Sequence, residues 1–237
     1  MDLNDKRAIV LGGTSGIGLA VTRQLIEAGA RVVAGSRSSA NVSEASKQAP
    51  GATFVQIDVL DRAGLESLFT HHARFDILVN AATGGERATG PFLQMDLDGF
   101  QGSFRKLWGY TNSVRLGAPQ MSPTGAIVLV SGYPARKANP GLSALSAVGN
   151  AVEGFARAIA PEIAPRRINV VSPGVIDTPL IVVPDDQRAG RLEAMTKNQP
   201  IARAGTADEV ASAIVYLLQN DFITGSTIDV DGGALLP

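Results

Sequence analysis

An apolar run that leads into a glycine-rich turn and then into a helical pattern constrains the fold of this chain more than any other feature. Residues 8–11 read Ala-Ile-Val-Leu, residues 12–18 read Gly-Gly-Thr-Ser-Gly-Ile-Gly, and a stretch suited to a helix continues to residue 28. The glycines allow a tight turn and let a pyrophosphate approach the backbone at the positive end of the helix. The strand before and the helix after distinguish this arrangement from an ordinary glycine-rich turn. We therefore predict a dinucleotide site formed by Gly12, Thr14, Ser15, Gly16, Ile17 and Gly18.

Apolar runs and helical patterns alternate along the rest of the chain, with no low-complexity linker between them. We expect strands at 8–11, 31–34, 53–58, 77–80, 126–131, 168–172 and 227–230. We expect helices at 17–28, 62–72, 100–116, 143–163 and 207–218. This rhythm predicts an α/β protein: a single doubly wound Rossmann domain over residues 1–237, with a mainly seven-stranded parallel sheet and helices on both faces.

Composition restricts the possible partners. The 237 residues are 45% hydrophobic and 18% charged, which suffices for a sizeable core, and a net charge of −1 without a basic block gives no indication of nucleic-acid binding. The absence of cysteine excludes thiolate catalysis and cysteine-bound metal. His71 and His72, the only histidines, are neighbours near a helix end, which favours a surface position over a metal site or a catalytic base. Without a signal peptide or an apolar run of about 20 residues, we expect a cytoplasmic protein that does not enter a membrane.

The residues after the second strand indicate which nicotinamide cofactor binds. An acidic side chain there would bind a ribose 2′-hydroxyl and select NAD, whereas this chain carries Ser36 and Arg37. A hydroxyl and a guanidinium suit the 2′-phosphate of NADP(H), although a solvated arginine is the alternative. We predict NADP(H).

Further cofactor contacts are expected where other strands end. Asp58 and Val59 follow the third strand and suit the adenine edge, and Asn80, Ala81 and Ala82 place small residues beside the cofactor after the fourth. The turn after the sixth strand suits the nicotinamide carboxamide through Pro173, Gly174, Ile176 and Thr178. The proline-containing stretch 178–200 then follows on the ligand-binding side of the sheet, and we interpret it as a substrate-side flap, with an ordinary surface excursion as the alternative.

Together these segments resemble the short-chain dehydrogenase/reductase family over nearly the whole chain. The resemblance is carried by residues 12–18, by Asp58-Val59, by Leu78-Val-Asn-Ala-Ala82, by Pro173-Gly-Val-Ile-Asp-Thr178 and by residues 223–233. It implies a nicotinamide cofactor, a small-molecule substrate and a homodimer or homotetramer. The family usually has threonine just before the first glycine, where this chain has Leu11.

The same resemblance implies that the usual catalytic side chains are missing. The family uses a tyrosine, a lysine four residues later, a serine and an asparagine. Residues 139–155 resemble its catalytic helix, which places the tyrosine position on Leu145 and the lysine position on Gly149. The serine position falls on Gly132, next to Ser131, and the asparagine position on Lys106, or on Leu107 if the register slips by one. The change of all four indicates a different chemistry or none.

Other side chains are candidates for the missing chemistry. Tyr133 and Lys137 have the tyrosine–lysine spacing, but Pro134 and the preceding strand favour a loop, in which the two side chains would not stack. Tyr133 remains able to reach a substrate. We prefer Lys106 as the replacement acid or electrostatic stabiliser, with Ser131 or Tyr133 as its hydroxyl partner, because a buried lysine has a lowered pKa and donates protons readily. The alternative is a structural lysine that extends its charge to solvent or to a carboxylate.

Two functions therefore stay open. The first is an atypical NADP(H)-dependent oxidoreductase that moves hydride to or from a small carbonyl, imine or similar compound. The second is a non-catalytic NADP(H)-binding sensor or scaffold. Helix 143–163 also carries one face of small residues, which suits either the dimer contact implied by the family or close packing on the chain's own sheet.

Overall fold

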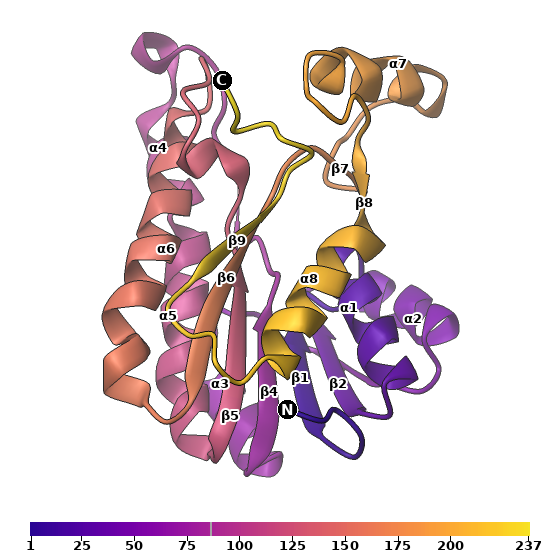
Figure 1. The fold of residues 1–237 in the computed structure, drawn as a ribbon, viewed down its shortest axis with the longest axis vertical. Coiled ribbons are helices and arrows are strands. Elements are labelled where there is room, and N and C mark those ends of the chain that lie inside the picture. The colour runs from indigo at the N-terminus through magenta and orange to yellow at the C-terminus, as the bar shows by residue number, and fades with distance from the viewer. Residues whose placement is uncertain (86) are drawn as a thin grey trace.

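The computed structural model describes residues 1–85 and 87–237 and confirms the predicted fold class. Seven parallel strands form one sheet in the order β3-β2-β1-β4-β5-β6-β9 (Figure 1). Strands β2 and β3 are added on one side of β1, and the strands from β4 onward are added on its other side. The runs of Val, Ile and Leu in the inner strands β1, β4, β5 and β6 are buried on both faces, as parallel strands covered by helices require. The strands are β1 (Arg7–Leu11), β2 (Arg31–Ser36), β3 (Thr53–Gln56), β4 (Phe75–Asn80), β5 (Met121–Val130), β6 (Arg167–Pro173) and β9 (Thr227–Val230).

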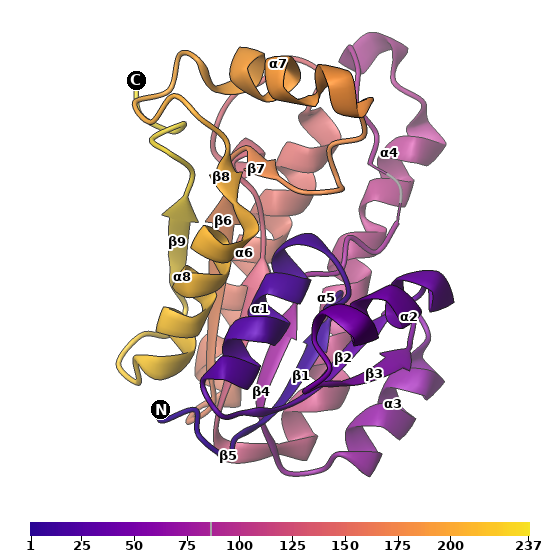
Figure 2. The same cartoon turned by 90° about the vertical axis from the view of Figure 1, so that its right-hand side faces the viewer.

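Helices cover both faces of the sheet. α1, α2 and α8 lie on one side, and α3, α5 and α6 on the other, while α4 and α7 stand beyond the carboxyl ends of the strands (Figures 1 and 2). The helices are α1 (Gly16–Glu27), α2 (Ser39–Gln48), α3 (Arg62–His71), α4 (Leu97–Ser103), α5 (Arg105–Gly117), α6 (Ser143–Ile163), α7 (Asp185–Thr196) and α8 (Ala207–Gln219). Three short 3₁₀ turns are η1 (Phe92–Gln94), η2 (Ala118–Gln120) and η3 (Tyr133–Ala135), and two short strands, β7 (Ile176–Asp177) and β8 (Gly205–Thr206), pair separately.

The predicted helix 100–116 is wrong in its bounds, because the structure divides this region into α4 and α5. The hydroxyl of Ser103 donates to the carbonyl of Gly99, and the amide of Phe104 donates to Gln101 in a tighter turn. Such local bonds compete with the regular helical ladder, and glycine weakens it further. The break fixes where α5 begins, and therefore the place of Lys106.

The sequence prediction missed α2 and α7. α2 has only one buried side chain, Ala45, so it lacks the apolar stripe that reveals a helix, and its start is marked instead by Ser38, whose hydroxyl accepts from the amide of Asn41. α7 lies within the stretch 178–200 and is mostly exposed. The same stretch is joined to β7 by Arg188, whose Nε donates to Oδ1 of Asp177 over 2.8 Å.

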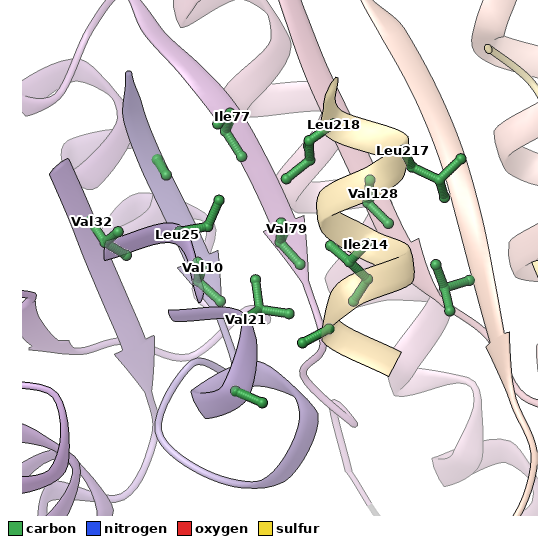
Figure 3. Close-up of a cluster of buried hydrophobic side chains, with 14 of the residues drawn as sticks. Val10, Val21, Leu25, Val32, Ile77, Val79, Val128, Ile214, Leu217 and Leu218 are labelled. Atoms are coloured by element: carbon green, nitrogen blue, oxygen red, sulfur yellow. The ribbon is translucent and has the colours of Figure 1, made fainter. Parts of the chain in front are cut away.

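Two apolar layers hold the helices to the sheet. On one face, side chains of α1 and α8 meet those of β1, β2, β4 and β5 around Val10, Val21, Val79, Val128 and Ile214 (Figure 3). The other face packs against α3, α5 and α6. Burying a Val or Leu side chain contributes about 1.5–3 kcal/mol, so these layers hold the strand ends, and the loops after them, in fixed positions.

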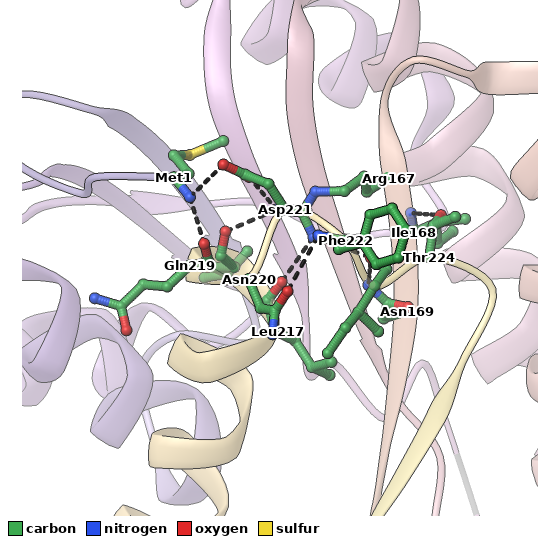
Figure 4. A network of polar contacts seen from close by, with 12 residues as sticks. Met1, Arg167, Ile168, Asn169, Leu217, Gln219, Asn220, Asp221, Phe222 and Thr224 are labelled. Atoms are coloured by element: carbon green, nitrogen blue, oxygen red, sulfur yellow. Dashed lines mark hydrogen bonds and ion pairs between the residues drawn. The ribbon is translucent and has the colours of Figure 1, made fainter.

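A polar network fastens the amino end of β6. The guanidinium of Arg167 donates to the carbonyls of Leu217 and Leu218 over 2.8 and 2.7 Å and pairs with Asp221, which also accepts from the Met1 ammonium (Figure 4). A cation suits the carbonyl end of α8, where backbone acceptors lack helical partners. This network lies at the end of the sheet opposite to the predicted site. Within the described ranges, the helices are too short or too polar to cross a membrane.

Candidate cofactor cleft and active site

The glycine loop after β1 is tightly enclosed by the ends of its neighbouring strands. Gly12 has a φ of +79°, and a Cβ there would lie 2.6 Å from the amide nitrogen of Ala82. The amide of Gly12 donates to the carbonyl of Gly35 over 2.8 Å. A Cβ on Gly18 would overlap the carbonyl of Gly12. The loop therefore holds its shape through backbone contacts that only glycine permits.

The first turn of α1 offers amide groups to a ligand. Ser15 precedes the helix in an extended conformation and its hydroxyl caps none of the helical amides, while Thr14 is buried beside it. A Cβ on Gly16 would lie 3.2 Å from the Cβ of Thr178, so the loop and the turn after β6 face each other. Uncapped amides at a helix start attract an anion, and the arrangement fits the pyrophosphate of a dinucleotide.

Ser36 and Arg37 lie at the carboxyl end of β2, as expected for a 2′-phosphate site. Ser36 is the last residue of the strand, and its hydroxyl accepts weakly from the amide of Ser38 over 3.4 Å. The carbonyl of Arg37 accepts from Nε2 of Gln56 over 2.9 Å, so the backbone is held while the side chain is exposed. Within residues 1–85 and 87–237, the Arg37 guanidinium has no ion pair.

The remaining predicted cofactor residues line the same edge of the sheet, but several of their polar groups are already engaged. Asp58 accepts from the amide of Leu60 over 2.9 Å, and Val59 is buried against Gly109. Asn80 is fully buried: its amide nitrogen donates to Ser113 over 2.9 Å and its oxygen accepts from Ala82 over 3.1 Å. The Asn80 side chain therefore fixes the turn through Ala81 and Ala82 by contacts within the protein.

The turn after β6 is held in a similar way. The amide of Gly174, which follows Pro173, donates to the carbonyl of Val230 over 3.0 Å, and a Cβ on Gly174 would lie 2.6 Å from the Cα of Asp231. Ile176 and Thr178 are buried next to it. This turn lies opposite Gly16, at the start of α1.

Gly149, where the resemblance predicts the family's lysine position, has no room for a side chain. A Cβ there would lie 2.8 Å from the Cβ of Ala135 and 3.2 Å from Oγ of Ser131. Ala135 ends the turn η3, and the side-chain amide of Asn150 donates to its carbonyl. The turn therefore fills the volume beside α6 that a lysine stem would need, which is the physical reason for glycine at this position.

The hydroxyl of Ser131 faces α6. Its Oγ lies 3.2 Å from both the carbonyl of Gly149 and Oε1 of Glu153. The buried Glu153 carboxylate also lies 3.4 Å from Arg136, whose guanidinium pairs with Asp229. The Ser131 hydroxyl is therefore hydrogen-bonded within the protein, and it is the backbone carbonyl of Ser131 that contacts Lys106.

Lys106 lies at the start of α5 and carries its ammonium to the end of β5. Nζ donates to the carbonyl of Ser131 over 3.1 Å and lies 5.6 Å from the centre of the Tyr110 ring. Burial, and secondarily the charge of Arg87, lowers the pKa of Lys106 to about 7. Tyr110 is fully buried, donates to the carbonyl of Val130 over 3.0 Å, and has a pKa raised by burial. Lys106 therefore exchanges a proton near neutral pH, whereas Tyr110 keeps its own.

Tyr133 is half-buried at the start of η3, and burial raises its pKa while Arg87 opposes that rise. The predicted loop around Pro134 is thus a 3₁₀ turn, and Lys137 does not stack on Tyr133 but donates to the carbonyl of Ala234. Arg87 acts on both Tyr133 and Lys106 and was missed by sequence reasoning. Its position after β4, in a glycine-rich loop at the carboxyl edge of the sheet, was the signal that could have indicated it.

Comparison with known proteins places this geometry among nicotinamide enzymes. Residues 12–234 match the family described as enoyl-(acyl carrier protein) reductase. The chain is 31% identical to L-xylulose reductase of Bos taurus, covering 99% of each sequence. A solved structure of a short-chain dehydrogenase/reductase family protein superposes with a TM-score of 0.86 at 32% identity, over 99% of each chain. A small-chain dehydrogenase solved in complex with NADPH superposes with a TM-score of 0.85 at 28% identity, over 99% of this chain and 100% of the other.

Proposed function

The chain belongs to the short-chain dehydrogenase/reductase family, and from this premise we propose that it is an atypical NADP(H)-dependent reductase in which Lys106 donates the proton. One observation carries the proposal. The Lys106 ammonium reaches the end of β5 with a pKa of about 7 and donates to the carbonyl of Ser131, whose hydroxyl contacts Gly149. The resemblance places the usual tyrosine and lysine positions on Leu145 and Gly149. The substrate would be a small carbonyl compound, imine or similar molecule.

Separate groups at the carboxyl edge of the sheet support the binding of NADP(H). The amides of residues 12–18 would hold the pyrophosphate, and Ser36 and Arg37 would hold the 2′-phosphate. The turn through Pro173, Gly174, Ile176 and Thr178 would meet the carboxamide, beside Ala81 and Ala82. When bound, the reduced cofactor supplies the hydride. The similarity to a protein solved with NADPH supports this choice of cofactor.

Lys106 would bind the oxygen of a carbonyl substrate and release one ammonium proton to it as negative charge develops. The carbonyl of Ser131 occupies one of the three ammonium hydrogens and orients the other two. A positioned general acid contributes about 10²–10⁴-fold, and its efficiency is greatest when its pKa is near the working pH. Tyr133 would add a second hydrogen bond to the same oxygen without giving up its own proton. Water then restores the proton to Lys106.

The remaining expectations complete the proposal. We infer one domain over residues 1–237, with the stretch 178–200 acting as a flap over the substrate. Trp108 on α5 is 57% exposed, and α5 and α6 lie side by side on one face of the sheet (Figure 1), which supports a homodimer or homotetramer through these helices. A cytoplasmic setting agrees with the composition.

A non-catalytic NADP(H)-binding role is the second candidate, and the placement of Ser131 favours it. The Ser131 hydroxyl faces Glu153, and the side chain of Ala135 packs against Gly149. Protein atoms therefore occupy the space that the family's serine and lysine side chains would use. A sensor or scaffold would need the cleft and not the chemistry.

Turnover separates the two candidates. NADPH oxidation is measured with a panel of ketones, aldehydes, 2-oxo acids and cyclic imines, using the wild type, Lys106→Met and Tyr133→Phe. We expect turnover with at least one compound, a fall of at least about tenfold in kcat/KM for Lys106→Met, and a smaller fall for Tyr133→Phe. Lys106→Met keeps the apolar stem, so NADPH affinity and the melting temperature serve as folding controls. Turnover that Lys106→Met leaves unchanged would contradict the assigned donor, and NADPH binding without turnover would favour the second candidate.

A further inference from the structure

The loop that carries Arg87 is held directly against the start of α5. Gly84 has a φ of +74°, and a Cβ there would lie 2.7 Å from the Cα of Lys106. A Cβ on Gly85 would lie 3.0 Å from Cδ of Arg105. The amide of Ala88 donates to the hydroxyl of Ser103 over 2.9 Å. Contacts on both sides of Arg87 therefore place it beside the helix turn that presents Lys106.

The same loop is also joined to the segment before α6. The amide of Gly90 donates to the carbonyl of Gly141 over 2.9 Å, and a Cβ on Gly141 would lie 3.5 Å from the backbone of Gly90. Residues 84–85 and 87–90 thus contact both the start of α5 and the loop beyond η3. The charge of Arg87 acts on Lys106 and on Tyr133.

Two cations and a phenol therefore belong to the carboxyl edge of β4 and β5, where the charge of Arg87 acts on Lys106 and on Tyr133. Arg105 stands next to Lys106 but is exposed, and Tyr110 keeps its proton beneath the ammonium. Arg87 is exposed as well, and the burial of part of its side chain lowers its pKa. Within the described ranges, neither Arg87 nor Lys106 forms an ion pair with a carboxylate. Two neighbouring cations repel each other, and an anion bound between them offsets that repulsion.

We propose that Arg87 is a specificity-determining residue that binds an anionic group of the substrate, of the carboxylate class, next to the carbonyl that Lys106 protonates. The proposal rests on the proposed function and names its substrate class: small oxo acids or their imine equivalents. A guanidinium binds a carboxylate through two parallel hydrogen bonds, which would fix the distance between the anionic group and the reacting carbonyl.

Binding of such an anion has a consequence for the proton donor. Free Arg87 disfavours the charged form of Lys106 by like-charge repulsion. A carboxylate on Arg87 offsets that charge and adds an attractive one, so it raises the pKa of Lys106. Lys106 is then in its ammonium form when the substrate is bound. The anionic substrate thereby increases the protonation of the group that donates the proton for its reduction.

The test measures the protonation of Lys106 without any turnover. Acylation by acetic anhydride, followed by mass spectrometry of the Lys106 peptide, gives the fraction of neutral amine at each pH in protein saturated with NADPH. The probes are oxamate, an analogue of 2-oxo carboxylates, and oxamide, its uncharged counterpart of similar shape. We expect oxamate to raise the midpoint by at least about 0.5 in pH and oxamide to leave it unchanged.

Variants identify the group that binds the anion. Arg87→Gln should raise the midpoint without any ligand and abolish the response to oxamate, whereas Arg87→Lys should keep part of it. Arg105→Gln, one residue from Lys106 and exposed, is the matched control and should respond like the wild type. Inorganic phosphate, tested in the same way, reports whether the subsite prefers a phosphate to a carboxylate, and a response to phosphate alone would contradict the carboxylate class.

Three outcomes would overturn the proposal: no response to oxamate, an equal response to oxamide, or a loss of NADPH affinity in Arg87→Gln, which would assign the guanidinium to the cofactor. The proposed reductase function fails separately, in the absence of turnover across the substrate panel. Turnover of uncharged ketones with no oxamate response would refute the anion subsite and leave the reductase in place.

Discussion

Two regions of the molecule differ in what forms their site. The first is the half of the sheet around β1, β2 and β3, and the second is the half around β5 with the adjoining helix α6. In the first half, the site is made of backbone: Gly12, Gly18 and Gly35 are positions where neighbouring chain segments approach too closely for a side chain. In the second half, the resemblance predicts a site made of side chains. At the positions that it points to, Ala135 packs against Gly149 and the Ser131 hydroxyl is directed at Glu153.

The difference teaches that binding and chemistry are separable in this fold. A backbone cradle depends on the glycine pattern and the strand order, so it persists as long as the sheet does. A set of catalytic side chains depends on a few positions and their packing, so substitutions at these positions can change it while the sheet stays intact. Lys106, the proton donor that we propose, reaches the end of β5 from α5 rather than from α6. The predictions below test each half in turn.

The largest effect is expected in the backbone half. Gly12→Ala would bring a methyl group to 2.6 Å from the amide nitrogen of Ala82 at a φ of +79°. Because the neighbour is main chain, the loop must move, and NADPH binding should weaken by at least about 100-fold, which equals ~2.7 kcal/mol. Fluorescence titration with NADPH measures this. Gly190→Ala in α7, where a Cβ meets nothing within 4 Å, is the control and should bind normally.

A smaller effect is expected where one side chain selects the cofactor. Arg37→Ala should weaken NADPH by about 10–100-fold, because a charge-assisted hydrogen bond contributes about 1.5–3 kcal/mol. NADH affinity should stay the same, and Arg31→Ala at the other end of β2 should change neither. Equal losses for the two cofactors would show that Arg37 does not contact the 2′-phosphate.

In the side-chain half, restoring the family's residues should cost stability. Gly149→Ala places a methyl group 2.8 Å from the Cβ of Ala135, and overpacking of this kind costs about 1–3 kcal/mol, or roughly 2–4 °C in Tm per kcal/mol. Adding Ala135→Gly should recover part of the loss, since it removes the opposing atom. Leu145→Tyr with Gly149→Lys should lower Tm further and fail to raise turnover. A gain of activity with unchanged Tm would show that the usual site still fits.

The smallest effect is expected at the pair between Arg136 and Asp229, which holds the segment after η3. Both side chains are about one-third exposed, at 35% and 31%. Asp229→Asn should therefore lower the free energy of unfolding by less than about 1 kcal/mol, and the difference from the wild type should shrink as salt screens the charges. Thermal denaturation at low and high salt measures it. A loss of several kcal/mol would mean that this pair supports the active-site turn far more strongly than its exposure indicates.

Sequence reasoning predicts the backbone half well because its signals are local. The order of strands and glycines follows from runs of neighbouring residues, and the confirmed fold class depends on nothing else. The prediction failed for α2, whose single buried side chain gives no stripe, and for the break at Phe104, which depends on hydrogen bonds rather than on hydrophobic periodicity.

The side-chain half was less predictable because its geometry depends on contacts between distant residues. That Gly149 is closed by Ala135, that the Ser131 hydroxyl meets Glu153, and that Arg87 lies near Lys106 all require the fold. The identity of Lys106 as a candidate came from its place relative to a family pattern. Its environment, which brings its pKa to about 7, came only from the structure.

The pH dependence of reduction tests the role of Lys106 most directly. With the best substrate from the panel and saturating NADPH, kcat is measured from pH 5.5 to 9.5. The donor must carry its proton, so kcat should be level below the pKa of Lys106 in the bound complex and fall about tenfold per pH unit above it. That pKa is about 7 in the free protein, and an anion on Arg87 would raise it. Lys106→Met should remove this limb and lower the plateau. A limb that persists in Lys106→Met, or that disappears instead in Tyr133→Phe, would contradict Lys106 as the proton donor.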